Sequence, residues 1–168
     1  GLAACFVTAR DASGVTAKEI LAATGIKGGL VVHVSCGTPS AGADQAGSLT
    51  AALRATPSFT VHGLSRDYAV VQDARRHISA RGLSGPVSVD WWDGQKLPYV
   101  DNLVNLVVAH ELPQAGGMAE IMRVLVPNGV ARVWDGELWR SVRKPRPDDI
   151  DQWTHYLHDV TNNAVAHD

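Results

Sequence analysis

The chain has 168 residues, of which 45% are hydrophobic and 19% charged, and its formal net charge at pH 7 is −2. This composition excludes a disordered tail, a coiled coil and a collagen-like fibre, and the small negative charge argues against a general nucleic-acid-binding surface. The two cysteines, Cys5 and Cys36, are too few for a disulfide scaffold or a cysteine-rich zinc module. No run of about 18 apolar residues is present, so no membrane-spanning helix is expected.

Residues 1–15 are expected to form an N-terminal extension. The chain begins with Gly1, and residues 2–7 are apolar and mostly small. The sequence Leu-Ala-Ala-Cys at positions 2–5 resembles a lipoprotein cleavage box. The extension is therefore either the remnant of an export signal or an ordinary apolar stretch. An export signal would place the protein in the periplasm or at the envelope.

Helical and strand patterns alternate from residue 16 to residue 134. In chain order they predict a helix over 16–23, a strand over 30–34, a helix over 48–54, a strand over 59–64, a helix over 68–80, strands over 87–89 and 103–108, a helix over 118–125 and a strand over 130–134. Most of the strands are nearly continuous apolar runs, which is typical of strands covered on both faces. The alternation predicts an α/β fold, a Rossmann-like, doubly wound, mostly parallel sheet with helices on both faces. We expect the run Val31 to Val34 at its middle.

Glycine and short polar residues mark the helix ends. Gly25 is expected to stop the first helix. Ser48 and Asp67 are expected to cap the second and third helices. The fourth helix is expected to stop at Pro127-Asn128-Gly129.

The character of the sequence changes after residue 139. Four basic residues between 140 and 146 are interleaved with Pro145 and Pro147, and three aspartates follow by residue 151. This pattern predicts a linker that leaves the domain. We therefore expect one domain over residues 16–139 and a separate region over 140–168.

The loops after Val34, Leu64, Val89 and Ala109 are the places to look for a site, because ligands of open α/β sheets bind outside the carboxyl ends of the strands. Ser35-Cys36-Gly37 directly follows the first strand, and a glycine there lets the backbone approach a ligand closely. Cys36 is favoured as a loop residue over a nucleophile, since no His/Asp partner can be assigned to it.

Two longer stretches make the pattern more specific. The first is Asp93-Gly94-Gln95-Lys96-Leu97-Pro98-Tyr99, and the second is Met122-Arg123-Val124-Leu125-Val126-Pro127-Asn128-Gly129. With the first loop and the strand order, residues 30–134 resemble the class I S-adenosylmethionine-dependent methyltransferases, in particular the type 11-like group. The resemblance implies a Rossmann-like fold, S-adenosylmethionine as the cofactor, and methyl transfer.

The resemblance also implies which residues form the site. The cofactor would lie against Ser35, Cys36, Gly37, Ser65, Asp93, Gly94 and His110. The candidate catalytic residues are His110 and Glu111, which follow the fourth strand where the family places groups near the reactive methyl.

Several positions depart from the family pattern. His33 stands where the family has an acidic residue, and Ser35 replaces the first glycine of the loop. Pro39 stands at another glycine position, and Asn105 replaces an aspartate. Ser65 has no carboxylate to hold two ribose hydroxyls. These departures predict weakened cofactor binding.

The C-terminal segment carries a second resemblance. The sequence from Asp151 to Ala166 is similar to the segment that opens a PQQ-like β-propeller in large bacterial proteins. That resemblance implies a longer polypeptide in which the propeller is the partner of this domain. The His-x-x-His spacing at 155–158 is also compatible with a metal site, but a strap that docks on the propeller is favoured, so no metal is expected.

Two functions of different classes therefore remain open. The first is an S-adenosylmethionine-dependent methyltransferase that works mainly by positioning its cofactor and acceptor. The alternative is a non-catalytic, methyltransferase-like module that packs against the propeller.

Overall fold

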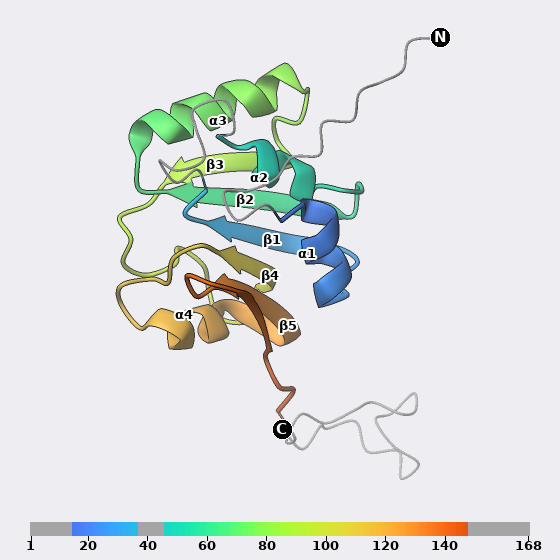
Figure 1. Ribbon diagram of the computed structural model, residues 1–168, viewed down its shortest axis with the longest axis vertical. Coiled ribbons are helices and arrows are strands. Elements are labelled where there is room, and N and C mark those ends of the chain that lie inside the picture. Colours follow the sequence, from blue (N-terminus) through green and yellow to red (C-terminus); the bar gives the residue numbers. More distant parts are fainter. Residues whose placement is uncertain (1–14, 37–45, 148–168) are drawn as a thin grey trace, which may run out of the picture.

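The computed structural model describes residues 15–36 and 46–147, and these residues form one six-stranded sheet with helices on both faces (Figure 1). The strands are β1 (Gly29–Val34), β2 (Phe59–Ser65), β3 (Val87–Trp91), β4 (Val104–Ala109), β5 (Leu125–Trp134) and β6 (Trp139–Arg143). Their order is β3-β2-β1-β4-β5-β6, and only the pairing of β6 with β5 is antiparallel. The prediction of a mostly parallel, doubly wound α/β sheet is confirmed.

Four helices lie among the described residues: α1 (Ala17–Thr24), α2 (Ser48–Leu53), α3 (Tyr68–Ala80) and α4 (Gly117–Val124). Buried residues of α1, α2 and α3 share one core cluster on one face of the sheet. Buried residues of α4 belong to a second cluster on the other face. Successive residues of each strand point to opposite faces, so they contribute alternately to the two clusters.

The expected centre of the sheet is confirmed. Val31, Val32 and Val34 of β1 have no exposed surface, and neither has Val107 of β4. β1 pairs with β2 on one side and β4 on the other. Continuous apolar runs are required there because both faces of these strands are covered by helices.

Two of the four helix-end predictions are confirmed, those for Gly25 and Asp67. Thr16 caps α1 in a reciprocal capping box, accepting from the Glu19 N–H at 3.2 Å and donating its own N–H to the Glu19 carboxylate at 2.7 Å. Gly25 ends the helix with φ +70°. Asp67 caps α3 by accepting from the Ala69 N–H at 2.8 Å.

The predicted cap of α2 is wrong. Gly47, with φ +75°, occupies the N-cap position, and Ser48 is the first helical residue. A Cβ on Gly47 would lie 2.8 Å from the Ala74 Cβ of α3, so the close approach of two helices requires glycine at this position. Sequence pattern alone cannot show this contact, because Ala74 is far along the chain.

The end of α4 also differs from the prediction. The helix ends at Val124, and β5 begins at Leu125, which pairs with Val104. Asn128 has φ +66°, and the register between β4 and β5 shifts between Val104 and Leu106. Pro127, which lacks an N–H, therefore lies in an irregularity inside the strand rather than at the helix end.

The linker predicted from residue 140 is wrong over the residues of β6. Trp139–Arg143 pairs with β5 through a hairpin in which the Asp135 carboxylate accepts from the N–H groups of Glu137 and Leu138 at 3.0 and 2.8 Å. Val142 packs into the second core cluster and Trp139 against the first. The domain therefore extends beyond the expected boundary at 139, because alternate residues of this basic stretch are held by the two faces of the sheet.

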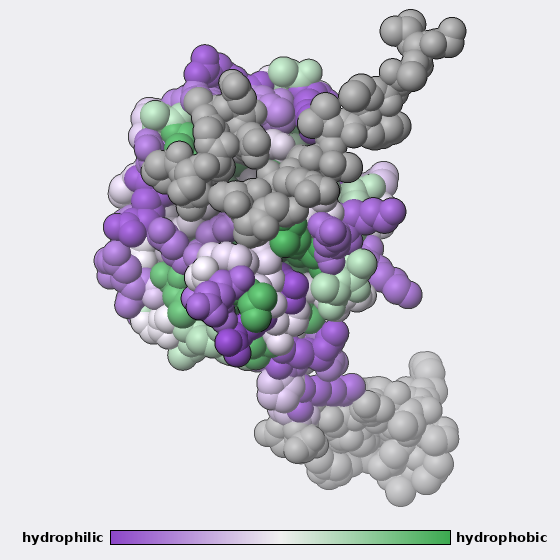
Figure 2. All heavy atoms as spheres, viewed as in Figure 1, coloured by the Kyte–Doolittle hydropathy of each residue, from purple (hydrophilic) through white to green (hydrophobic). Residues whose placement is uncertain are grey.

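The parts of the chain expected as an N-terminal extension and as the start of a propeller lie almost entirely outside the described residues. Within 15–36 and 46–147, no helix is long and apolar enough to cross a membrane. On the face shown in Figure 2, hydrophobic residues of the described part form small patches among hydrophilic ones.

Candidate functional site

The order in which strands are added to the sheet reverses beside β1. From β1 the chain moves outward through β2 to β3, and it then returns to place β4 on the opposite side of β1. In an open parallel sheet this reversal leaves a crevice outside the carboxyl ends of the two central strands. The loops that follow β1, β2, β3 and β4 meet at this edge, which we call the carboxyl edge.

A polar bridge crosses the carboxyl edge. The Ser35 hydroxyl, after β1, donates to the Glu111 carboxylate, after β4, over 3.4 Å. The same carboxylate oxygen lies 3.9 Å from Nη1 of Arg66, which follows β2. The Arg66 and Glu111 side chains are about half exposed, so this pair contributes about 1 kcal/mol or less. A ligand can therefore separate it at little cost.

The loop after β3 joins the bridge through Gly94. Gly94 has φ +86°, and a Cβ at that position would lie 2.9 Å from Nε of Arg66. The guanidinium therefore lies directly against the Gly94 backbone. Asp93 is exposed, and its carboxylate accepts from the Gln95 N–H at 2.8 Å. The carboxyl edge thus brings together Ser35, Arg66, Gly94 and Glu111, while Asp93 stands beside them.

The end of β2 carries no carboxylate available to a ligand. Ser65 is buried, and its hydroxyl oxygen accepts from the Asp67 N–H at 3.3 Å. The Asp67 carboxylate is engaged as the cap of α3. Turning Asp67 toward a ligand would lose that cap, which costs about 1 kcal/mol.

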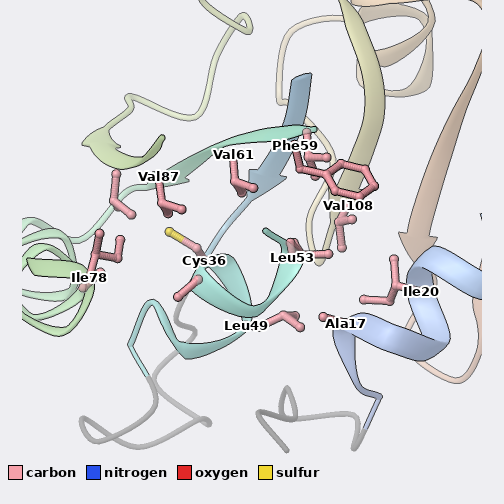
Figure 3. Packing of buried hydrophobic residues seen from close by; sticks show 14 of the residues in the cluster. Ala17, Ile20, Cys36, Leu49, Leu53, Phe59, Val61, Ile78, Val87 and Val108 are labelled. Atoms are coloured by element: carbon pink, nitrogen blue, oxygen red, sulfur yellow. The ribbon is translucent and has the colours of Figure 1, made fainter. Parts of the chain in front are cut away.

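Cys36 belongs to the core and not to the surface of the carboxyl edge. Figure 3 shows its side chain among the apolar residues of the first cluster. A Cβ on Gly63 would lie 3.0 Å from its sulfur. Burial raises the pKa of the Cys36 thiol to about 12, so the thiol is protonated at neutral pH and is a poor nucleophile. Its N–H donates to the Leu64 carbonyl at 3.0 Å. Gly37 lies outside the described residues.

His33 places a neutral side chain in β1 at the position where the resemblance implies a carboxylate. Its ring is buried, and Nδ1 lies 2.8 Å from the Thr50 hydroxyl of α2. Burial, with a further contribution from His110, lowers the pKa of His33 to about 3. The position at which the resemblance expects a carboxylate is therefore occupied by an uncharged imidazole.

His110 lies at the junction of the carboxyl edge with β6. Its ring centroid is 5.4 Å from that of His33 and 5.0 Å from that of Trp139, with an edge-to-face arrangement to the tryptophan. Trp139 was not expected here, because it follows the last predicted strand, 130–134, and no strand was predicted for it. Arg66 was also missed, although it directly follows a strand that ends at the expected site. The position of Arg66 after β2 is the signal that could have identified it.

Two neighbouring tryptophans divide between core and surface, as strand alternation predicts. Trp92 is buried and donates its indole N–H to the Lys96 carbonyl at 2.7 Å. Trp91 is 56% exposed and donates to the Arg66 carbonyl at 3.1 Å. Only Trp91 is accessible to a ligand at the end of β3. No group of three or more metal-ligating side chains is found within the described residues.

No protein-family model matches this sequence, and no curated protein matches it. Solved structures do match its fold. A protein from Methanococcus maripaludis assigned as an S-adenosyl-L-methionine-dependent methyltransferase is 23% identical, with a TM-score of 0.58 over 70% of this chain and 52% of its own. Geranyl diphosphate C-methyltransferase from Streptomyces coelicolor, crystallised with Mg²⁺, geranyl diphosphate and S-adenosyl-L-homocysteine, is 16% identical, with a TM-score of 0.56 over 70% and 43%.

A third structure with this fold is the [4+2]-cyclase SpnF, which is 24% identical, with a TM-score of 0.57 over 70% of this chain and 43% of its own. The chain thus spans about half of the length of these structures or less. At these identities the comparisons show the fold, a Rossmann-like α/β domain shared with S-adenosylmethionine-dependent methyltransferases. The cyclase is named for a different reaction although it has the same fold. The fold alone therefore does not determine the chemistry, which depends on the residues of the carboxyl edge.

Proposed function

We propose that this chain is a methyltransferase-like domain whose carboxyl edge binds S-adenosylmethionine weakly. One observation carries the proposal: the reversal of strand order beside β1 brings Ser35, Gly94 and His110, from three separate loops, to one edge of the sheet. The named activities of structures with the same fold support the choice of cofactor.

The positions of the residues at the carboxyl edge suit a nucleoside cofactor, but their side chains offer only weak interactions with its ribose. The backbone at Ser35 and Cys36, the loop at Asp93 and Gly94, and the end of β2 at Ser65 would surround it. The edge offers serine where a carboxylate would form charge-assisted hydrogen bonds, each worth about 1.5–3 kcal/mol. The loss of such bonds corresponds to roughly tenfold to hundredfold weaker binding.

The bound cofactor supplies a methyl group that a nucleophilic acceptor can take. His110 is placed to accept the proton that such an acceptor releases, because its ring lies at the carboxyl end of β4, beside the edge. Glu111 is less suited to that role, since its carboxylate is already engaged by Ser35 and Arg66. The acceptor would gain the methyl group and lose one proton to the imidazole.

Calorimetric titration with S-adenosylmethionine tests the proposal. We expect the chain to bind the cofactor in the high-micromolar range or more weakly. Ser65→Asp should tighten binding roughly tenfold to hundredfold, since it restores a carboxylate at the end of β2. Ser65→Ala is the matched control and should leave binding within about twofold. Low-micromolar binding by the unchanged chain would contradict the weak hold on the ribose, and no gain in a folded Ser65→Asp variant would contradict the placement of the site.

A second candidate function is a non-catalytic module that packs against a PQQ-like β-propeller. Two features favour it: His33 is neutral, and Arg66 is already paired with Glu111. Neither leaves an unpaired charge at the carboxyl edge that a charged ligand would balance. The segment whose sequence resembles the propeller start lies outside the described residues. Titration of a separately produced propeller with this chain would test the module: submicromolar association together with undetectable cofactor binding would favour it over the enzyme.

A further inference from the structure

The two outer strands of the sheet differ in how their outward backbone groups are occupied. On β3 these groups have partners: the Val87 N–H donates to the Leu83 carbonyl at 3.0 Å, and Nε of Arg75 donates to the Val89 carbonyl at 2.8 Å. Such contacts protect an edge from pairing with another strand. The opposite edge of the sheet is β6, the last strand in the order.

The backbone of β6 presents free hydrogen-bonding groups to its outer side. The Lys144 N–H donates to the Gly129 carbonyl at 2.9 Å, and the Lys144 carbonyl accepts from the Asn128 N–H at 3.0 Å, so Lys144 faces β5. In an antiparallel pair alternate residues face the neighbouring strand, so the backbone groups of Ser141 and Arg143 point away from β5. Among the described residues, these outward groups have no hydrogen-bond partner. An incoming strand would find two N–H and two carbonyl groups there.

The side chains around this edge are mainly basic. Residues 128–147 contain five basic and two acidic side chains, in a chain whose net charge is −2. Arg143 donates to the Thr24 carbonyl at 3.1 Å. Lys144 donates to the Leu125 carbonyl at 2.8 Å. These partners are uncharged, and neither cation forms an ion pair within the part of the chain that the structure describes.

Two further arginines flank the edge, one on each face of the sheet. Arg132 of β5 donates to the Ser141 hydroxyl at 2.8 Å and lies 6.0 Å from the ring centroid of Trp139. Arg140 is exposed and paired with Asp135. Ser141 is paired with Arg132 across the two strands, and Arg140 precedes it, so the two arginines project to opposite faces. An incoming strand would therefore meet positive charge on both of its faces.

Charge decides which kind of strand this edge can accept. If two copies of the chain paired through β6, their basic side chains would lie close together, and like charges across a strand pair are destabilising. Pro145 has no N–H, so pairing cannot continue far beyond Arg143. A short extended segment with acidic side chains meets both conditions. It pairs with the free backbone groups and places carboxylates opposite the basic side chains.

We propose that the outer edge of β6 binds an acidic, extended segment of a partner protein as an additional strand of the sheet. The backbone groups of Ser141 and Arg143 supply the pairing. The side chains of Arg140, Arg143 and Lys144 select a segment that carries carboxylates. The inference goes beyond the proposed function, because strand addition at β6 requires no cofactor.

Titration of the 168-residue chain with an acidic peptide, followed by ¹H–¹⁵N NMR, tests the proposal. The probe is an acetylated and amidated peptide of eight residues in which Glu and Val alternate. We expect the amide signals of Ser141 and Arg143 to shift and their hydrogen exchange to slow, with Kd of about 0.1–1 mM. The same peptide with Gln in place of Glu should bind at least tenfold more weakly. The Glu peptide methylated on its backbone nitrogens keeps the charge but cannot pair as a strand, and it should lose at least as much.

Variants separate backbone pairing from charge. Ser141→Pro removes one outward N–H, at an edge position where proline is tolerated, and should weaken peptide binding at least tenfold. Ser141→Ala is the matched control, since it loses the same hydroxyl but keeps the N–H, and it should bind within about twofold of the unchanged chain. Arg140→Gln should weaken binding about threefold to tenfold. Arg76→Gln removes an exposed arginine of α3 and should leave the affinity unchanged. The folded fraction of each variant is measured from its own spectrum.

Four results would overturn the proposal. They are no response at Ser141 and Arg143, equal binding of the methylated peptide, unchanged affinity in folded Ser141→Pro, and unchanged affinity in Arg140→Gln. Equal binding of the methylated peptide would indicate a general anion-binding surface instead of strand addition.

Two further measurements identify the occupant and separate the proposals. A triple variant, Asp148→Asn with Asp149→Asn and Asp151→Asn, removes the acidic side chains that follow the edge in the same chain. Peptide binding to this variant alone would show that the chain's own acidic segment is the occupant, which would overturn a partner segment. S-adenosylmethionine is titrated separately. Peptide binding without cofactor binding supports the β6 edge and removes the methyltransferase proposal, whereas cofactor binding without peptide binding does the reverse.

Discussion

The loop that carries Asp93 and Gly94 is tied to α4 by one buried carboxylate, and removing that carboxylate should destabilise the whole domain. Glu120 is 6% exposed and accepts from the Leu97 N–H at 2.9 Å. Its two oxygens also accept from Nε and Nη2 of Arg123 at 2.9 and 2.7 Å. Glu120→Ala leaves both donors without this acceptor.

The expected loss is about 3 kcal/mol. Removing one partner of a buried ion pair costs about 3–5 kcal/mol, and the lower end applies here because the Arg123 side chain is 32% exposed and keeps its bond to Asp101. In a domain of this size that loss lowers Tm by about 6–12 °C. Glu120→Gln should lose less, because its amide oxygen can still accept from the Leu97 N–H.

Urea unfolding and thermal melts measure the effect, and Asp73→Ala supplies the matched control. Asp73 and Arg76 form an ion pair with the same three-residue spacing on α3, but the Arg76 side chain is 80% exposed. Its removal should cost about 0.5 kcal/mol or less. Equal losses in Glu120→Ala and Asp73→Ala would refute the claim that burial sets the cost.

The same pair predicts a dependence on pH. The bond from Arg123 holds the pKa of Glu120 below its ordinary value of 4.5. Because the pKa is lower in the folded state, the stabilisation is complete above about pH 4.5 and is lost as the pH falls through the folded pKa. The difference in unfolding free energy between the unchanged chain and Glu120→Ala should therefore shrink in acid. A constant difference from pH 7 to pH 3 would contradict this assignment.

Three further predictions concern residues of β1 and the loop that follows it. Burial raises the pKa of Cys36 to about 12, so iodoacetamide should alkylate this thiol in urea but not in the folded chain at pH 8, as peptide mass mapping would show. Burial lowers the pKa of His33 to about 3, so the stability it supports should decline as the pH falls from about 6.5 toward 3; an imidazole NMR signal of His33 that titrates near pH 6.5 would refute this. Gly29 has φ +99°, and a Cβ there would lie 2.1 Å from the Asn105 side-chain oxygen, so Gly29→Ala should cost about 2–4 kcal/mol in urea unfolding. Gly85→Ala, with φ +101° and open space around its Cβ, should cost about 1 kcal/mol, and equal costs would count against the clash.

Local sequence was sufficient for most of the elements of this fold. The apolar run at 31–34 and the signals at Gly25 and Asp67 act over a few residues, so their consequences can be read from the chain. Alternation of strand and helix patterns then limits the architecture, because each apolar face must be covered by a neighbour. The mostly parallel sheet and its central strand follow from these local facts.

Contacts between distant segments decided what the local patterns could not. The glycine requirement at Gly47 comes from Ala74 of another helix. The strand β6 exists because Trp139 and Val142 find opposite faces of a sheet formed by earlier residues, which outweighs the linker-like run of arginines and prolines around them.

The candidate site divides in the same way. The order of strands and loops predicted where a ligand would lie, since the carboxyl ends of parallel strands share one edge. The sequence did not determine that Arg66 lies against Gly94, that the Cys36 side chain turns into the core, or that Arg132 and Trp139 meet on adjacent strands. Each of these depends on pairing and packing between residues far apart in the chain, and such contacts form only when the tertiary structure brings those residues together.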